Sequence, residues 1–341
     1  MTSPAAEVLI VSLGATEGLR RADAQLRDSI ERAGVRASIA AAARPRPLRT
    51  MAATDLAWAL SARAAARRAL AAASRPPRAV VYSTTTAALL WPARGAVRFD
   101  ATARGNRPGR HGVWQRPLER RRLAQATLLM PWSEGALREG APPAAARGAL
   151  VVPVAAAPSG PASEERDIAA LTYAANPSKK GLDRVLAAWG AVEAERPAGE
   201  ELLVAGTNPE ECARAGIDVA GVPRVRTLGP LSTAEYFSLV RRARVFVCAP
   251  RREDYGIAQL EALADGCMLV TSPAPGPYAA LPIARELDPR LVGEDLAQGL
   301  RDALGRPLTD YAQRAAAALA PYAPAAVDAL VARELLPRLL S

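Results

Sequence analysis

The chain has 341 residues, which is enough for two domains of ordinary size. Three cysteines without Cys-x-x-Cys spacing predict a reduced, cytoplasmic protein and exclude a disulfide scaffold. A single histidine, His111, excludes a histidine-rich metal site, and no apolar run reaches the roughly 18 to 20 residues of a membrane span.

The formal net charge of +10 is divided unevenly along the chain. Residues 1–150 hold 24 arginines, no lysine and 10 acidic residues, whereas residues 151–341 hold 20 basic and 24 acidic residues. The first part therefore has a net charge of +14 and the second part −4. A strongly basic half favours an anionic partner for that half.

Strands and helices alternate through the first half of the sequence. Apolar runs predict strands at residues 8–13, 35–40, 79–83, 96–99 and 127–130, and helices are predicted at 18–33 and 55–73, with a helix or turn at 84–90. This order predicts a parallel, doubly wound sheet with helices on its faces. Gly14 begins a loop after the first strand, and Asp100 lies just past the fourth.

The segment 102–122 contains seven arginines, a Pro-Gly pair, Trp114 and His111. Four interpretations stay open: a mobile lid, a clamp for an acceptor phosphate, a patch for an anionic membrane, or a nucleic-acid surface. Leu118, Leu123 and the arginines around them would suit a basic amphipathic helix on a membrane. The sequence has no helix-turn-helix, zinc or RNP pattern to support nucleic acid.

Residues 155–165 are rich in Ala, Pro and Ser and predict a linker between domains. Beyond it, strands are predicted at 168–173, 201–205, 225–228, 245–248 and from 268, and helices at 182–192, 233–242, 295–304 and 324–340. Ser232 and Glu235 form a predicted capping box for the helix that begins at 233.

Residues 245–272 predict a strand, a loop, a helix and a second strand, which is a βαβ unit. Glu253 lies in the loop at the carboxyl end of the strand, and Glu261 lies on the helix. Ligands of open α/β sheets bind at this edge, and the helix N-terminus suits a phosphate. Gly256 allows backbone to approach a ligand closely. The unit therefore indicates a pocket for a phosphorylated sugar or a nucleotide sugar.

Residues 253–267, EDYGIAQLEALADGC, resemble the E-x7-E signature of retaining GT-B glycosyltransferases of group 1 (family 4), whose usual form is E-G-F-G-x-x-x-x-E-A-M-A-x-G. The resemblance is specific over 168–304 and architectural before that. Residues 149–154, which include Pro153, resemble the last strand of the family's first domain, so the resemblance predicts a strand there. It implies two Rossmann-like domains facing across a cleft: an acceptor domain at 1–160, a nucleotide-sugar domain at 161–323, and a C-terminal helix at 324–341 that returns to the first domain.

The resemblance also implies roles for individual residues. Glu253 would hold the transferred sugar and Glu261 the ribose, and Lys180 would contact the diphosphate of the donor. Asp100 would lie near the acceptor and the reacting carbon. The other implied donor-binding residues are Tyr255, Gly256, Ile257, Arg252, Gly14 and Leu228. Family members retain the anomeric configuration, generally need no metal or other cofactor, and use the departing phosphate to help deprotonate the acceptor.

The sequence departs from the family at Ala174-Ala175, where the family commonly has Gly-Arg. The missing arginine removes a phosphate contact, and Arg251 and Arg252 are the candidates to replace it. This departure keeps open a non-catalytic GT-B-like scaffold. An arginine-rich nucleic-acid or membrane-binding protein is the other alternative. As an enzyme, the basic first half favours an anionic or membrane-associated acceptor, which would place the protein at the inner face of a membrane.

Overall fold

The computed structural model describes residues 6–46, 48–163 and 165–341, which form two compact units. The first unit comprises the chain up to residue 155 together with residues 322–341, and the second comprises residues 156–321. Pro47, in the predicted loop 44–49, and Glu164, in the predicted linker, lie outside the described residues.

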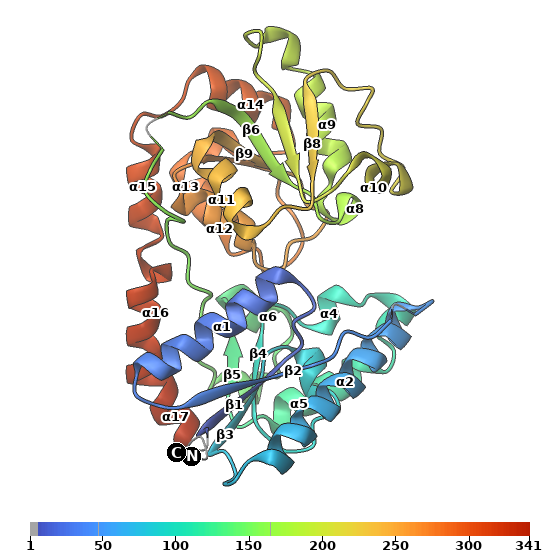
Figure 1. Ribbon diagram of the computed structural model, residues 1–341, viewed down its shortest axis with the longest axis vertical. Helices are drawn as coiled ribbons and strands as arrows, with labels where there is room; N and C mark the ends of the chain where they lie inside the picture. Colours follow the sequence, from blue (N-terminus) through green and yellow to red (C-terminus); the bar gives the residue numbers. More distant parts are fainter. Residues whose placement is uncertain (1–5, 47, 164) are drawn as a thin grey trace. The chain divides into compact units, whose positions relative to one another are not determined.

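The first unit is built on a five-stranded sheet whose order is β2-β1-β3-β4-β5, with every pair parallel (Figure 1). The strands are β1 (Val8–Ser12), β2 (Ala37–Ala41), β3 (Ala79–Tyr82), β4 (Ala96–Phe99) and β5 (Leu129–Pro131). The helices are α1 (Glu17–Arg32), α2 (Met51–Ala72), α3 (Thr85–Ala88), α4 (Ala103–Asn106), η1 (Gly109–Gly112), α5 (Gln115–Gln125), α6 (Glu134–Gly140) and α7 (Pro143–Ala146).

Both faces of this sheet are buried, as the continuous apolar run of β1 requires. Successive side chains of a strand point to opposite faces. Val8 and Ile10 pack with Leu26 and Ile30 of α1. Leu9 and Val11 lie in the cluster on the other face, which α2, α3 and α5 cover. Leu123 of α5 is buried there, so this leucine of the predicted amphipathic helix packs in the core and is not available to a membrane.

The C-terminal segment completes the first unit. It consists of α16 (Pro324–Leu330), a π-helical turn η5 (Val331–Leu335) and α17 (Leu336–Leu340). Val331 and Leu335 pack on the same face as α1, and Asp328 pairs with Arg32 at 2.7 Å. The π turn directly precedes the turn that holds Pro337, whose ring has no N–H and crowds the preceding carbonyls.

The strand predicted at 149–154 is wrong, because the structure has no regular strand there. Leu150 and Val152 still donate their N–H groups to the carbonyls of Leu129 and Pro131 on β5. Pro131 has no N–H to return, so a two-way ladder cannot form beside it.

The second unit has its own five-stranded parallel sheet, in the order β10-β9-β6-β7-β8. Its strands are β6 (Ile168–Tyr173), β7 (Leu202–Ala205), β8 (Val225–Gly229), β9 (Ala243–Cys248) and β10 (Met268–Thr271). Its helices are α8 (Pro177–Lys180), α9 (Leu182–Gly190), η2 (Glu193–Glu195), α10 (Pro209–Arg214), α11 (Thr233–Arg242), α12 (Ile257–Ala264), α13 (Ala280–Leu287), η3 (Pro289–Leu291), α14 (Leu296–Gly305), α15 (Tyr311–Ala318) and, where the chain returns to the first unit, η4 (Ala320–Tyr322).

The strand order of the second unit reverses between β6 and β9. From β6 the chain builds outward through β7 to β8, then returns to place β9 and β10 on the other side of β6. The loops after β6 and β9 therefore diverge, and a crevice at such a reversal is where α/β sheets bind ligands. The predicted α/β fold with parallel sheets is confirmed in both units. The capping box of Ser232 and Glu235 on α11 is confirmed as well.

Candidate functional site

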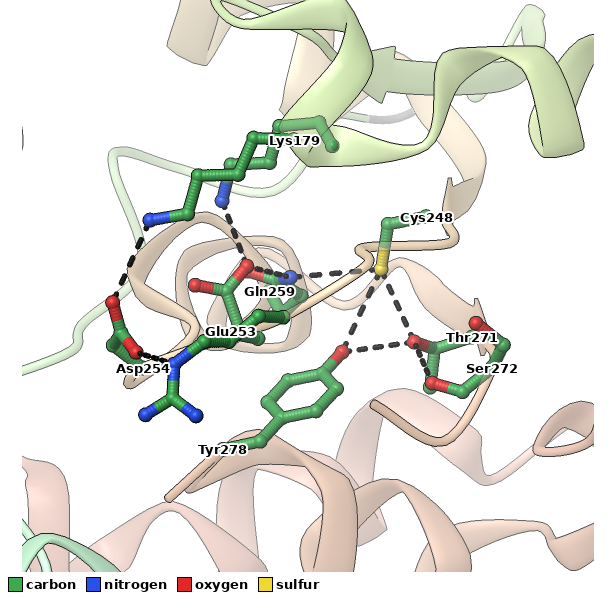
Figure 2. Close-up of polar contacts among 10 residues, drawn as sticks. Lys179, Cys248, Glu253, Asp254, Gln259, Thr271, Ser272 and Tyr278 are labelled. Carbon is green, nitrogen blue, oxygen red and sulfur yellow. Dashed lines mark hydrogen bonds and ion pairs between the residues drawn. The ribbon is translucent and has the colours of Figure 1, made fainter. Parts of the chain in front are cut away.

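The candidate site lies at the carboxyl edge of the second unit's sheet, where the strand order reverses. Lys180 comes from the segment after β6, and Glu253 comes from the loop after β9. Lys180 Nζ and Glu253 Oε2 are 2.7 Å apart (Figure 2). Residues 73 positions apart in sequence are thus joined because β6 and β9 are neighbours.

A short helix and a glycine hold Lys180 in place. Asn176 caps α8 by accepting the N–H of Lys179 at 2.9 Å. Gly181 then takes the left-handed conformation, with φ of 63°. A Cβ at this position would lie 1.9 Å from the carbonyl oxygen of Ala249, so only glycine fits. The N–H of Arg251 donates to the carbonyl of Lys179 at 3.0 Å, which ties the two loops together.

Glu253 is held from two sides. Its Oε2 accepts from Lys180 and, at 3.1 Å, from Gln259 Nε2 on α12. Glu253 is only 7% exposed. Burial lowers the pKa of Lys180, but the charge and hydrogen bond of Glu253 outweigh it, so the pKa is raised and the ammonium stays charged. The pair is a fixed, partly desolvated dipole at the mouth of the sheet.

Asp254 forms a second charged group beside the first. Arg252 donates to Asp254 at 2.8 Å, and Lys179 lies 3.5 Å from the same carboxylate. The N–H of Glu253 donates to the carbonyl of Pro275 in the loop after β10. The two lysines and Arg252 therefore present cationic groups around two carboxylates (Figure 2). Such a set matches an anionic ligand that also carries hydroxyl groups.

Three polar side chains, those of Cys248, Thr271 and Tyr278, form a hydrogen-bonded group beneath Glu253, which we call the polar floor. Cys248 Sγ donates to Thr271 Oγ1 at 3.2 Å, and Tyr278 OH lies 2.8 Å from the same hydroxyl (Figure 2). Gln259 Nε2 is 3.6 Å from the sulfur, so this amide connects the floor to Glu253. Burial raises the pKa of Cys248 and of Tyr278, which keeps both groups neutral. The floor can orient Glu253 without adding charge.

Gln259 was not predicted from the sequence. It is 2% exposed, and its Oε1 has no hydrogen-bond partner among the described residues. The available signal was a polar residue between Ala258 and Leu260 on an otherwise apolar stretch of α12. Cys248 and Tyr278 gave no such signal, because each suits a buried strand or loop position.

The N-terminus of α12 opens at the same edge. Gly256 is its N-cap, in the left-handed region with φ of 92°, and it has no side chain to occupy the first-turn N–H groups. A Cβ there would lie 2.9 Å from the ring of Tyr278. Glu261, four residues after Ile257, is half-buried on α12. This helix end can receive a phosphate, with a carboxylate one turn further along.

The structure groups most of the predicted site residues but not all of them. Seven of the predicted residues belong to the segments after β6 and β9 and to α12, namely Lys180, Arg252, Glu253, Tyr255, Gly256, Ile257 and Glu261. Tyr255 is 2% exposed, so little of its ring faces solvent. Leu228 lies on the edge strand β8, separated from β9 by β7 and β6.

Gly14 and Asp100 belong to the first unit. Gly14 follows β1 with φ of 56°, and its carbonyl accepts from Arg20 at 2.9 Å. Asp100 follows β4, and its Oδ1 accepts the N–H of Ala101 at 2.9 Å. Both therefore lie at the carboxyl edge of the first sheet, where a ligand of that unit is expected.

Ala174 and Ala175 stand where the resembled family has Gly-Arg, directly after β6. Of the two arginines considered as replacements, Arg251 is half-exposed and pairs with Asp183 at 2.6 Å. Arg252 is better placed, since its side chain is 19% exposed and bonded to Asp254 next to Glu253. Within the described residues, no group of three or more His, Cys, Asp or Glu side chains is arranged to hold a metal.

Comparison with known proteins gives a family match over part of the chain and a shared fold. Residues 167–310 match the model of the family Glycosyl transferases group 1. The fold matches WaaG, a glycosyltransferase involved in lipopolysaccharide biosynthesis, with 13% identity, a TM-score of 0.68 and coverage of 96% of this chain and 99% of that one. It also matches sucrose-phosphate synthase from Thermosynechococcus elongatus, with 14% identity, a TM-score of 0.73 and coverage of 97% and 98%.

A third match is an alpha,alpha-trehalose-phosphate synthase (UDP-forming) from Burkholderia xenovorans, with 14% identity, a TM-score of 0.55 and coverage of 76% of this chain and 72% of that one. No protein with a curated description matches the chain in sequence. The resemblance drawn from the sequence is confirmed: the chain has the GT-B glycosyltransferase fold, and residues 167–310 match the family Glycosyl transferases group 1.

Proposed function

We propose that the protein is a retaining glycosyltransferase that moves a sugar from a nucleotide-diphosphate sugar to an acceptor. The observation that carries the proposal is the Lys180–Glu253 pair, held at the reversal of the second sheet beside the open N-terminus of α12. A cation and a helix end suit a diphosphate, and a buried carboxylate suits sugar hydroxyls. A donor that carries a diphosphate and a sugar can therefore contact the cation, the helix N-terminus and the carboxylate at the same time.

The proposed donor contacts follow from the chemistry of each group. The diphosphate lies against Lys180, Arg252 and the N–H groups of α12 that follow Gly256. Glu253 accepts hydrogen bonds from the hydroxyls of the transferred sugar, and Gln259 fixes the carboxylate that does so. Glu261 accepts from the ribose hydroxyls. Tyr255 and Ile257 shape the backbone around the diphosphate, and Leu228 contributes to the nucleotide side of the pocket.

In the proposed reaction, the bond between the anomeric carbon and the diphosphate oxygen breaks, and a bond from that carbon to the acceptor oxygen forms on the same face. The acceptor proton passes to the departing phosphate oxygen, so the reaction balances without a protein nucleophile. Lys180 offsets the charge that grows on the diphosphate. Asp100, at the carboxyl edge of the first sheet, is proposed to hold the acceptor. No metal or other cofactor is required by this scheme.

The acceptor is proposed to bind the first unit. Its charge of +14 over residues 1–150 favours an anionic or membrane-associated acceptor, and hence a cytoplasmic enzyme that works at the inner face of a membrane. Nucleic acid is not proposed as a partner.

A non-catalytic GT-B-like scaffold is the second candidate, and the observation that favours it is Ala175. Without an arginine there, the diphosphate loses a charged hydrogen bond worth roughly 1.5 to 3 kcal/mol. A scaffold of this kind could still bind a nucleotide but would not turn a sugar donor over.

Turnover separates the two candidates. The protein would be incubated with sugar donors of uridine, guanosine, adenosine, cytidine and thymidine diphosphate and a membrane lipid extract, and release of the nucleoside diphosphate would be measured. The enzyme reading predicts release with one donor class, abolished by Glu253→Gln, and a product whose anomeric configuration by NMR equals that of the donor. An inverted product contradicts retention, and no release from any donor supports the scaffold.

A further inference from the structure

The large hydrophobic side chains that are most exposed gather on one part of the first unit. In the described part of the chain these side chains are Leu48 (50% exposed), Met51 (45%), Leu56 (41%), Leu60 (51%) and Val113 (68%). Four belong to the start of α2 and the residues before it, and Val113 directly follows η1. Scattered exposed leucines are ordinary, but here all five come from two neighbouring segments, which makes this part of the unit a candidate interaction site.

Two buried polar contacts hold these segments side by side. Asp55 of α2 accepts from Arg107 at 2.5 and 3.0 Å and from Gln115 at 2.7 Å. Residues on either side of η1 are thereby fixed to the first turns of α2, on which Met51 and Leu56 lie. We call the surface of residues 44–46, 48–60 and 104–116 the α2–η1 surface. α2, which is labelled in Figure 1, and η1 pack against each other.

The charge on the α2–η1 surface has one sign. Five of its arginines are exposed, namely Arg44, Arg46, Arg49, Arg104 and Arg110. Asp55 is the only acidic residue in these segments, and it is buried and neutralised by Arg107. The surface therefore offers aliphatic side chains and guanidinium groups with no exposed carboxylate between them.

We propose that the α2–η1 surface docks the protein on an anionic lipid bilayer. Aliphatic side chains enter the boundary between headgroups and acyl chains, and arginines bind the lipid phosphates at the same depth. Nucleic acid fits this surface less well, because its exposed large hydrophobic side chains are aliphatic and cannot stack on bases, whereas Trp58 and Trp114 are partly buried. None of the described helices has the length and apolar character to cross a bilayer, so the contact is peripheral.

This surface differs from the one that the sequence suggested. Leu123 is 1% exposed in the core, so α5 cannot present it to lipid. The docking elements are instead the residues before α2, its first turns and η1. The docking itself does not depend on sugar transfer. Its consequence for the acceptor, namely that the acceptor is reached at the bilayer surface, rests on the proposed function.

Vesicle sedimentation tests the proposal. The full chain would be mixed with two kinds of vesicle, at low and at high salt. One kind contains phosphatidylcholine alone, and the other also contains roughly 30 mol% phosphatidylglycerol, which gives the surface a negative potential. We expect partitioning to the anionic vesicles that weakens with salt. Equal binding to both vesicle types, or none to either, overturns the proposal.

Two sets of substitutions separate the charged and apolar parts. Arg44→Gln, Arg46→Gln and Arg49→Gln together should lower the partition coefficient about a hundredfold, since each basic residue near an anionic surface contributes about fivefold. Leu48→Ser, Met51→Ser and Val113→Ser together keep the charge and should lower it at least about tenfold. Arg285→Gln with Arg333→Gln, which removes exposed arginines elsewhere, should leave partitioning unchanged.

Three further results test the docking proposal against its alternatives. If the serine variant sediments as the wild type does, the apolar side chains do not enter lipid and the proposal fails. If DNA fragments displace the wild type from the vesicles and bind the serine variant equally well, the surface is a nucleic-acid site. Unchanged melting temperatures would show that all variants fold. Nucleoside diphosphate binding, measured on the same variants, should be unaffected, so failure of docking is distinguishable from failure of the proposed donor site.

Discussion

The carboxyl edge of the second unit's sheet gathers charges of both signs into pairs, whereas the α2–η1 surface of the first unit buries its one acid and exposes several arginines. Lys180 and Glu253 meet at 2.7 Å beside Gln259, and Asp254 is bonded to Arg252. In the first unit, Asp55 and Glu119 are buried, and the arginines of the α2–η1 surface face solvent.

In our proposals, one architecture serves two kinds of partner. A parallel five-stranded sheet gives each unit the same edge, and the loops decide what that edge presents. Matched charges in a buried setting favour a small ligand with several functional groups. Unmatched cations beside exposed aliphatic groups favour an extended anionic surface. The predictions below test the two halves of this comparison, beginning with the largest expected effect.

Removing the buried cation should cost far more than removing its exposed neighbour. Lys180→Met leaves Glu253 buried without its ion pair, and we expect the free energy of unfolding of the second unit to fall by about 3 kcal/mol. Lys179→Met removes a side chain that is half-exposed and should cost less than about 1 kcal/mol. Urea denaturation of both variants measures the two values. Equal costs would show that the Lys180–Glu253 pair is no more important than a surface contact.

The buried acid of the first unit predicts a pH dependence. Glu119 accepts the N–H of Ala103 at 2.9 Å, and burial raises its pKa from 4.5 to about 7. The folded state holds this proton more tightly than the unfolded state does. The contribution of Glu119 to stability is therefore largest below pH 4.5 and declines until about pH 7, by at most about 3 kcal/mol.

Glu119→Gln is the matched variant for this dependence of stability on pH, because glutamine keeps the shape of the side chain and cannot titrate. Denaturation at pH 5 and pH 8 should show that the wild type loses more stability over this interval than the variant does. The same slope in both proteins would assign the pH dependence to other groups.

Gly181 tests whether the backbone after β6 sets the position of Lys180. Gly181→Ala puts a Cβ against the carbonyl of Ala249 in a left-handed conformation, and should cost at least about 2 kcal/mol. Gly216 also has a positive φ, of 73°, but a Cβ there meets no described atom within 4 Å. Gly216→Ala should therefore cost only about 1 kcal/mol in the same denaturation experiment. A smaller cost at Gly181 than at Gly216 would mean that the two loops separate easily.

The sequence predicted the fold class because the strands are apolar runs with clear ends. The predicted strand at 168–173 has the observed bounds of β6, and Pro177 and Gly181 mark the turn that follows. The strand at 149–154 failed because its partner Pro131 cannot complete a ladder, which is a property of the neighbour and not of the segment.

The spacing of Glu253 and Glu261, together with Lys180, predicted the candidate site, but the sequence did not predict its geometry. The pairing of Lys180 with Glu253 depends on which strands are adjacent, and no local pattern encodes that. Gln259, Cys248 and Tyr278 come from three different elements and meet only after packing. The exposure of Leu48, Met51 and Val113 likewise depends on the tertiary structure, so the sequence directed attention to Leu123 instead.

Binding of nucleoside diphosphates to the second unit tests the central claim most directly. Melting temperatures would be measured with UDP, GDP, ADP, CDP and dTDP on the wild type, on Glu261→Ala, and on Glu294→Ala as an exposed acidic control in the same unit. A ligand at 100 times its dissociation constant stabilises by about 2.7 kcal/mol, which is several degrees. We predict that one nucleotide raises the melting temperature of the wild type and of Glu294→Ala. Glu261→Ala should lose this shift, because it lacks charged hydrogen bonds worth roughly 2 to 3 kcal/mol. No shift with any nucleotide, or an equal shift in all three proteins, would contradict the assignment of this site to a nucleotide-sugar donor.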